Sequence, residues 1–343
     1  MTHDMTQMRR EVLEIPDAVD RLLTDGAGAI EVAAKALRAR DPLFLATVAR
    51  GSSDHVATYL KYASELMLGV PVASVGPSVA SIYKAPLKLG RAACIGVSQS
   101  GKSPDIVELS RSARADGAFT IAVTNEPNSP LAETCDHCLP IHAGPELSVA
   151  ATKTFVNSAV AGLLMLARWK DDAEITQSIH ALPEQLAQAA QIDWPEMCAA
   201  IGGRKSLFTL GRGPVIAMSH EAALKFKETC QLHAESYSSA EVLHGPVSIV
   251  EQNFPVLAMT AADAAEGPLI DVADEIASKG ASVFATSDKA RVAKRLEFVR
   301  TNHALTDPIA LIVSFYAMVE KVAAERGINP DAPRHLKKVT ETI

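Results

Sequence analysis

The amino-acid sequence predicts an α/β protein with two tandem domains, each a doubly wound parallel sheet flanked by helices. Two observations predict this fold class. From Pro42 onward, short apolar runs that end in small residues alternate with amphipathic stretches, as in a parallel sheet covered by helices on both faces. The pattern then repeats, because residues 254–260 echo residues 92–98, and residues 285–286 echo residues 123–124, each 162 positions further along. Strand candidates that match at one offset indicate two copies of one unit.

The elements of the first copy follow in order along the chain. Residues 8–37 have a helical spacing of apolar side chains, with Pro16 as a helix start. The alternation that follows predicts strands at residues 43–48, 72–75, 92–97 and 120–123, and helices at residues 55–68 and 104–116. In the second copy, residues 207–213 echo the first strand and the Arg50-Gly51 pair that follows it.

These elements divide the chain into five parts. We expect an N-terminal helical segment at residues 1–40, a first α/β domain at 41–170, a helical linker at 171–200, a second α/β domain at 201–326 and a C-terminal tail at 327–343. Proline residues punctuate the linker, and Gly327 stops the last helix before the tail.

The composition excludes several classes of protein. The chain has 343 residues, of which 48% are hydrophobic, so it has enough apolar surface to fold rather than remain disordered. Its net charge of −7, without a basic tract, argues against nucleic acid and anionic membranes as partners. No apolar run reaches the length of about 18 residues that a membrane-spanning helix needs, and no signal peptide is visible. Five cysteines, an odd and sparse set, favour a reducing cytoplasm.

The loop at residues 98–104, Ser-Gln-Ser-Gly-Lys-Ser-Pro, is the strongest candidate for a binding site. It follows a buried type of strand and precedes a helix, with Ser103 suited to the N-cap and Pro104 to the first turn. Hydroxyl groups and free N–H groups at such a helix end can surround a phosphate. An ordinary polar loop with an N-cap serine is the alternative. Ser53, at the end of the first strand, can contribute another hydroxyl.

Three charged residues of the second copy, Glu221, Lys225 and Glu228, lie on one face of a predicted helix. A carboxylate there can move a carbon-bound proton, with neighbouring charges tuning its pKa. The alternative is a solvated Glu–Lys pair with a third charge beside it.

Two further residues, His244 and Lys338, are candidates only if the chain brings them to a site. His244 precedes Gly245-Pro246 in a loop, where an imidazole can act as an acid or a base. Lys338 lies in the tail and is a surface lysine unless the tail folds over a site. The run Cys135-Asp136-His137-Cys138 lacks a second Cys-x-x-Cys partner, so we expect no metal site.

Taken together, these motifs resemble the sugar isomerase (SIS) domain family. The resemblance rests on Ser-Gln-Ser-Gly-x-Ser, Glu-x-Ala-Leu-Lys-x-Lys-Glu, Glu-x-x-His-Gly-Pro and the C-terminal Pro-Arg-x-Leu-x-Lys, which occur in the family's order over nearly the whole chain. Within the family, the sequence is most similar to the isomerase half of glucosamine-6-phosphate synthase and to stand-alone SIS-type glucosamine-6-phosphate deaminases. The fold it implies is two tandem SIS domains.

The resemblance also implies roles for individual residues. It implies that the sugar phosphate is held by Ser53, Ser98, Gln99, Ser100 and Ser103. It implies that Glu228 is the base that moves a proton between C1 and C2, supported by Glu221 and Lys225. His244 would assist ring opening, and Lys338 would meet the open-chain ketose. The family's Val-Ala-Ser-Thr-Lys reads Val-Ala-Ala-Thr-Lys here, so that Ala151, beside Thr152, replaces a serine that helps to hold the sugar.

The function implied is an aldose–ketose isomerase and deaminase that converts glucosamine 6-phosphate and water to fructose 6-phosphate and ammonia. We expect no glutaminase domain, no cofactor, a hexosamine or hexose phosphate as ligand, and a homodimer. A fructosamine-6-phosphate deglycase and a galactosamine-6-phosphate deaminase/isomerase are related alternatives. A non-catalytic sugar-phosphate sensor is an alternative of another class. A sensor has no need of Glu228, His244 and Lys338 together, and the N-terminus contains no basic recognition helix.

Overall fold

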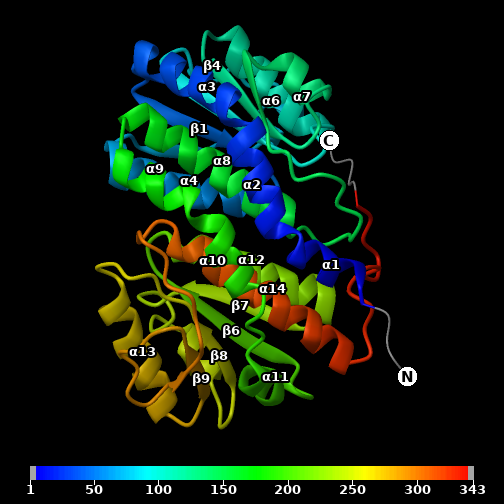
Figure 1. The fold of residues 1–343 in the computed structure, drawn as a ribbon, viewed down its shortest axis with the longest axis vertical. Helices are drawn as coiled ribbons and strands as arrows, with labels where there is room; N and C mark the ends of the chain where they lie inside the picture. Colours follow the sequence, from blue (N-terminus) through cyan, green and yellow to red (C-terminus); the bar gives the residue numbers. More distant parts are fainter. Residues whose placement is uncertain (1–4, 339–343) are drawn as a thin grey trace. The chain divides into compact units, whose positions relative to one another are not determined.

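A computed structural model describes residues 5–338 of the chain, and the described residues form two parallel sheets of five strands each (Figure 1). The contacts divide the chain into two units. Among the described residues, the first unit contains Asp17–Glu146, Lys153–His180 and residues 337–338; the second contains residues 5–16, Leu147–Thr152 and Ala181–Leu336. Each unit carries one sheet, as the repeated strand pattern predicts.

The first sheet has the strand order β2-β1-β3-β4-β5, and every pairing is parallel. On β1, Ala46 pairs with Ala73 of β2 and with Cys94 of β3. After β1 the chain adds β2 on one side and then β3 on the other. Ligands bind at such a switch point, here between β1 and β3, in open parallel sheets. The strands are β1 (Phe44–Val48), β2 (Val72–Ser74), β3 (Ala92–Val97), β4 (Phe119–Thr124) and β5 (His137–Pro140).

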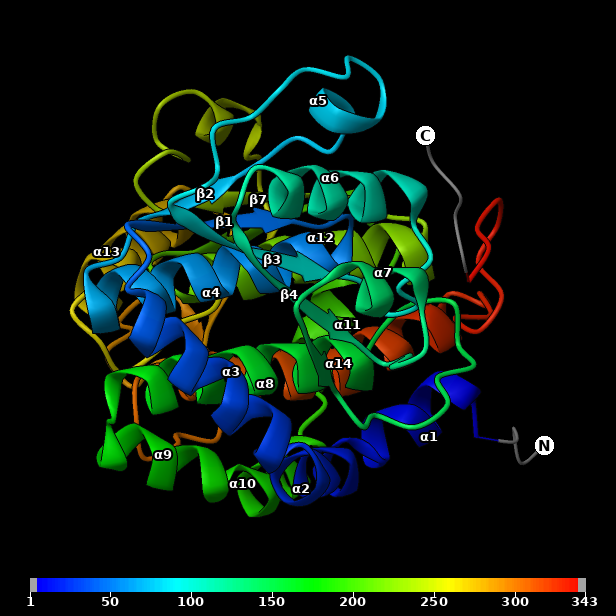
Figure 2. The same cartoon turned by 90° about the horizontal axis from the view of Figure 1, so that it is seen from above.

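Helices cover both faces of the first sheet. Figure 2 shows α6 on one face, and α4 and α8 on the other. Ile106 and Leu109 of α6 are buried against Cys94 and Ala122 of the sheet, which forms one half of the apolar core. The helices are α2 (Ile15–Asp25), which begins at the unit boundary, α3 (Ala27–Arg40), α4 (Ser52–Leu68), α5 (Ser78–Ser81), α6 (Pro104–Ala115), α7 (Pro130–Thr134), α8 (Lys153–Lys170) and α9 (Ala173–His180).

The second sheet repeats the topology of the first. Its order is β7-β6-β8-β9-β10, again all parallel, so that β6 takes the central position that β1 has in the first sheet. This match confirms the prediction of two copies of one doubly wound unit. The strands are β6 (Ser206–Gly211), β7 (His233–Ser238), β8 (Pro255–Ala258), β9 (Ser282–Ala285) and β10 (Lys294–Arg295).

The second sheet is also covered on two faces. Leu269 and Ile276 of α13 are buried against Val256 of β8, while α12 packs on β6 and β7 and contacts α14. The helices are α1 (Gln7–Leu13), α10 (Leu182–Ala189), α11 (Pro195–Ile201), α12 (Val215–Cys230), the 3-10 helix η1 (Pro246–Ile249), α13 (Glu266–Ser278) and α14 (Asp307–Glu325). No described helix has both the length and the apolar character that crossing a membrane requires.

The helical segment predicted at residues 8–37 is divided into three helices. Pro16 lies at the start of α2, where its missing N–H prevents α1 from continuing as one helix. A second break occurs at Gly26, whose Cβ, if present, would lie 2.7 Å from the carbonyl oxygen of Leu22. The close approach of the two backbones therefore requires glycine at this position.

Candidate active site

The loop at residues 98–103 joins the carboxyl end of β3 to the first turn of α6. Ser98 accepts a hydrogen bond at Oγ from the N–H of Gly101, 3.1 Å away, which curls the loop back on itself. Gly101 has φ +62°, and a Cβ there would lie 2.0 Å from Oγ of Ser129. Ser103 is the N-cap of α6, but its hydroxyl makes no capping bond. The loop therefore presents hydroxyl groups at the positive end of a 12-residue helix.

A second loop borders this one at the end of β1. Ser53 lies in the first turn of α4, two residues after Gly51, which is the N-cap. The two loops are joined by Arg50, whose Nε and Nη2 lie 2.9 and 2.8 Å from Oδ2 of Asp105. Asp105 is fully buried in the first turn of α6. The sequence analysis missed this pair, although an arginine before the glycine of the first loop was a visible signal.

The end of β4 supports the loop from the other side. The carbonyl oxygen of Gln99 accepts hydrogen bonds from the N–H of Asn125 at 3.1 Å and from Oγ1 of Thr124 at 3.2 Å. The side chain of Asn125 accepts from the N–H of Ala143 and donates to the carbonyl oxygen of Gly144. Gln99 and Ser100 are half-buried, so their side chains stay accessible to a ligand.

The tail lysine reaches the first unit. Nζ of Lys338 lies 2.8 Å from Oε2 of Glu146, a residue that the sequence analysis did not single out. Lys338 is 25% exposed, whereas the side chain of Glu146 is fully buried. An acidic residue three positions before the Val-Ala-Ala-Thr-Lys segment was the available signal.

In the second unit, α12 carries a buried cluster of three charged residues. Nζ of Lys225 lies 3.1 Å from Oε1 of Glu221 and 2.5 Å from Oε2 of Glu228. Tyr316 of α14 donates a hydrogen bond from its hydroxyl to Glu221, at 3.2 Å. Glu221 and Lys225 are fully buried, so the alternative of a solvated Glu–Lys pair is wrong.

The two carboxylates of this cluster favour the charged form of Lys225. Burial alone would lower the pKa of Lys225, but Glu221 and Glu228 outweigh it and hold the pKa above its ordinary value. Lys225 is therefore an ammonium that stabilises negative charge on both carboxylates. Glu228, 21% exposed, is the member of the cluster that reaches the surface. A carboxylate in this setting can accept a proton from a bound molecule.

The remaining candidates lie in loops of the second unit. His244 is exposed between β7 and η1, and within the described residues its imidazole forms no hydrogen bond. Thr152 is buried and Ala151 is half-buried in the segment Leu147–Thr152. Both oxygens of Glu11 accept from the N–H of Ser148 at 3.3 Å, which anchors the start of this segment.

The cysteine run of the first unit is used structurally. Asp136 accepts hydrogen bonds from the N–H and the hydroxyl of Thr120 and pairs with Arg114. Burial raises the pKa of the Cys135 thiol to about 11, which keeps it protonated near neutral pH. Within residues 5–338, no group of three or more His, Cys, Asp or Glu side chains could hold a metal ion.

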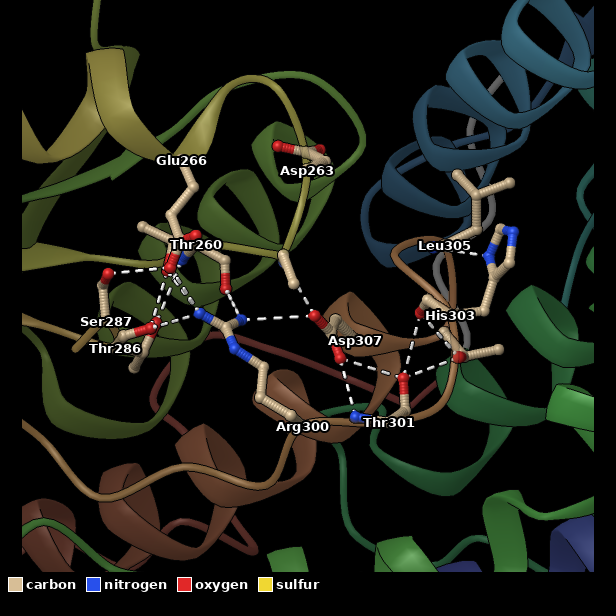
Figure 3. A network of polar contacts seen from close by, with 12 residues as sticks. Thr260, Asp263, Glu266, Thr286, Ser287, Arg300, Thr301, His303, Leu305 and Asp307 are labelled. Atoms are coloured by element: carbon tan, nitrogen blue, oxygen red, sulfur yellow. Dashed lines mark hydrogen bonds and ion pairs between the residues drawn. The ribbon is translucent and has the colours of Figure 1, made fainter. Parts of the chain in front are cut away.

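The second sheet differs from the first at the corresponding edge. Thr260 stands 162 residues after Ser98, but Arg300 fills the space beside it (Figure 3). The guanidinium of Arg300 donates to the carbonyl oxygens of Thr260 and Thr286 at 2.7 and 3.1 Å. It also pairs with Glu266 at 2.8 Å and with Asp307 at 3.3 Å. At this edge of the second sheet, the polar groups are therefore bonded to the chain's own side chains.

Comparisons with known proteins match both halves of the chain. The SIS domain signature covers residues 44–168. A solved structure from Silicibacter pomeroyi, of a protein assigned to the phosphosugar isomerases, is 66% identical with a TM-score of 0.93, over 95% of this chain and 100% of that one. Glutamine–fructose-6-phosphate aminotransferase (isomerizing) of Symbiobacterium thermophilum is 32% identical over 96% of this chain. The chain spans 58% of the length of that relative. Glucosamine-6-phosphate deaminase from Thermotoga maritima shares the fold at 19% identity, with a TM-score of 0.80 over 98% of this chain and 100% of that one.

Proposed function

The chain belongs to the SIS domain family, and on this basis we propose that it is a phosphosugar aldose–ketose isomerase that releases ammonia from glucosamine 6-phosphate. The products are fructose 6-phosphate and ammonia, and water is the second substrate. The observation that carries the proposal is the Glu221–Lys225–Glu228 cluster, in which a fully buried ammonium holds a surface-reaching carboxylate. That arrangement supplies a positioned carboxylate base, which a protein that only senses a sugar phosphate does not need.

The phosphate group is assigned to the serine-rich loops. Ser98, Ser100 and Ser103 supply hydroxyl groups at the end of α6, Gln99 adds an amide, and Ser53 adds a hydroxyl from α4. The positive ends of both helices favour a dianion. Binding the phosphate away from the reacting carbons orients the sugar, so that binding energy is used for positioning.

Glu228 is assigned as the base. After the ring opens, Glu228 removes the proton from C2 and the carbon chain is reprotonated at C1, which leaves an imine at C2. Water adds to the imine and ammonia departs, giving the ketose. Lys225, itself paired with Glu221, orients Glu228 through their ion pair, and His244 assists ring opening as an acid–base group.

Three further assignments complete the proposal. Lys338 meets the open-chain ketose, and Thr152 and Ala151 border the sugar. His244 is exposed and without a side-chain hydrogen bond in the described residues, which is compatible with a role at the site of a second subunit in a homodimer. The odd, sparse cysteines support a cytoplasmic location.

A coupled assay for fructose 6-phosphate and ammonia, with glucosamine 6-phosphate as substrate, tests the proposal. We expect the two products in equal amounts, and we expect added ammonia with fructose 6-phosphate to reverse the reaction. Release of glucose 6-phosphate from a fructosamine 6-phosphate would favour a deglycase, and preference for galactosamine 6-phosphate would favour that deaminase. Binding of hexose phosphates without turnover of any amino sugar would overturn the enzyme assignment in favour of a sensor.

A further inference from the structure

Glu146 is a buried carboxylate whose position is also fixed by contacts outside the tail. Its oxygens accept hydrogen bonds from the N–H of Thr154 at 3.1 Å and from Oγ1 of Thr154 at 2.7 Å. Thr154 lies in the first turn of α8, so the carboxylate also sits at the positive end of an 18-residue helix. Lys338 adds a third donor at 2.8 Å. Two donors and the helix end remain when Lys338 leaves, so the Glu146 carboxylate keeps hydrogen-bond partners after the lysine detaches.

Hydrogen bonds connect the serine-rich loop to Gly144, and the backbone continues from Gly144 to Glu146. The carbonyl oxygen of Gln99 accepts from the N–H of Asn125, and the side chain of Asn125 donates to the carbonyl oxygen of Gly144 at 2.9 Å. Glu146 follows Gly144 by two residues. Lys338 is therefore held at the same edge of the first sheet as the loop that we assign to the phosphate.

In the described part of the tail, a second anchor lies at its start. Residues 334–337 are exposed, and Asp331, at the start of the tail, is held by the N–H groups of Gln7 and Met8 at 2.8 and 2.7 Å. In the described part of the tail from residue 334 onward, the ion pair of Lys338 with Glu146 joins the tail to the first unit. Local propensity does not explain the placement of Lys338, since no helix or strand includes it.

We propose that Glu146 is the positioning residue that docks the C-terminal tail and places Lys338 beside the phosphate-binding loop. The inference deepens the proposed function and rests on it, because it makes that activity depend on a carboxylate that touches no substrate. Glu146 acts through Lys338. When the sugar phosphate binds, the ammonium exchanges Glu146 for the substrate, while the carboxylate stays in place at the end of α8.

Chemical labelling of the lysines tests the docking without using turnover. Trace acylation followed by mass spectrometry gives the ratio of reaction at Lys338 to reaction at its exposed neighbour Lys337, which is an internal control. We expect a low ratio in the unmodified chain, because the Lys338 amine is engaged and largely covered. Glu146→Gln should raise the ratio several-fold, because glutamine retains the bonds with Thr154 but cannot form the ion pair. The same ratio in both proteins would overturn the inference.

Kinetics then test whether the docking matters for the reaction. Glu146→Gln should lower kcat by about 10²-fold, as expected for loss of positioning, with little change in the KM for glucosamine 6-phosphate. Lys338→Met should lower kcat at least as much, and the double variant should be no worse than Lys338→Met alone. Glu133→Gln, on the exposed surface of α7, is the matched control and should behave as the unmodified chain.

The outcomes separate this inference from the proposed function. If the unmodified chain turns over no amino sugar, the proposed function fails while the labelling ratio still reports on the docking. If Glu146→Gln does not fold, Lys338→Met leaves the buried carboxylate and Thr154 in place and carries the test. Faster tryptic cleavage after Lys337 in Lys338→Met then supports the docking, and unchanged cleavage overturns it. Additive losses of kcat in the double variant would also contradict a role for Glu146 through Lys338.

Discussion

Among single residues, Glu228 depends most on its environment for the proposed chemistry. Its partner, Lys225, is fully buried and carries the charge that stabilises the carboxylate. Buried lysines are rare unless they are paired, because desolvating an ammonium costs several kcal/mol. The role of Lys225 is therefore its ion pairs with two carboxylates rather than apolar packing.

Glu228→Gln should lower kcat for glucosamine 6-phosphate by about 10²–10⁴-fold, the range for loss of a positioned general base. The thermal unfolding midpoint should fall less than in Lys225→Met, because glutamine has the same shape and Lys225 keeps its pair with Glu221. The coupled assay measures the loss, and Glu196→Gln, an exposed residue of α11, is the control. Near-normal ammonia release by Glu228→Gln would contradict the assignment.

Lys225→Met should destabilise the protein by about 3–5 kcal/mol, because it leaves the buried carboxylate of Glu221 without its cation. Methionine has a similar length, so the loss reports on charge rather than on a cavity. Urea unfolding at pH 7 measures the effect. An unchanged unfolding midpoint would mean that the cluster does not depend on the ammonium.

At the scale of elements, the serine-rich loop depends on the left-handed conformation of Gly101. Gly101→Ala places a Cβ 2.0 Å from Oγ of Ser129 at φ +62°, so the loop must move. Loss of one hydrogen bond to a dianion costs about 1.5–3 kcal/mol, so we expect the KM for the sugar phosphate to rise by about tenfold or more. Gly28→Ala in α3, where a Cβ meets open space, is the control. An unchanged KM in Gly101→Ala would separate the loop from phosphate binding.

The network around Arg300 predicts how stability depends on pH. Burial alone would raise the pKa of Glu266, but Lys289, Ser287 and Arg300 together hold it below its ordinary value. A carboxyl group with a depressed pKa stabilises the fold above its unfolded pKa of about 4.3, and that stability is lost as the pH falls through the folded pKa. Glu266→Gln should therefore flatten the fall in unfolding free energy between about pH 5 and pH 3. Urea unfolding over this range measures it, with exposed Glu275→Gln as control. Equal slopes in Glu266→Gln and the unmodified chain would contradict the role of this network.

The sequence predicted elements better than it predicted contacts. β3 was expected at residues 92–97 and lies there, because six consecutive buried positions leave one interpretation. The N-terminal stretch was expected to be helical with a helix start at Pro16, and α2 begins there, but the further break at Gly26 depends on backbone packing that the sequence pattern does not show. The contact of Lys338 with Glu146 joins residues 192 positions apart. Local periodicity holds no information on such a partner, so both Glu146 and the Arg300 network were missed.

At the scale of the whole molecule, the repeated topology has two different uses. Both sheets have the same strand order, yet the edge that carries serines in the first sheet carries Arg300 and its carboxylates in the second. One copy thus exposes a polar loop, which we assign to the ligand, and in the other copy the chain's own side chains fill the corresponding edge. The offset of 162 residues predicted the duplication, but it did not predict the difference between the two edges.

A prediction at this scale concerns stoichiometry. Because Arg300 occupies the corresponding edge of the second sheet, we expect one fructose 6-phosphate to bind per chain. Isothermal titration with fructose 6-phosphate measures this number, with Ser98→Ala as the variant that weakens binding. Two equivalent sites per chain would contradict the assignment of Arg300 as the group that fills the second edge.

Transfer of hydrogen at C2 is the step that the account depends on most. The direct test follows the deuterium of glucosamine 6-phosphate labelled at C2, by NMR, in the unmodified chain and in Glu228→Gln, with binding of the sugar phosphate confirmed for both by titration. We predict loss of the C2 deuterium with formation of fructose 6-phosphate in the unmodified chain, and its retention in a Glu228→Gln protein that still binds. Loss of that deuterium at a near-normal rate in Glu228→Gln would contradict the account.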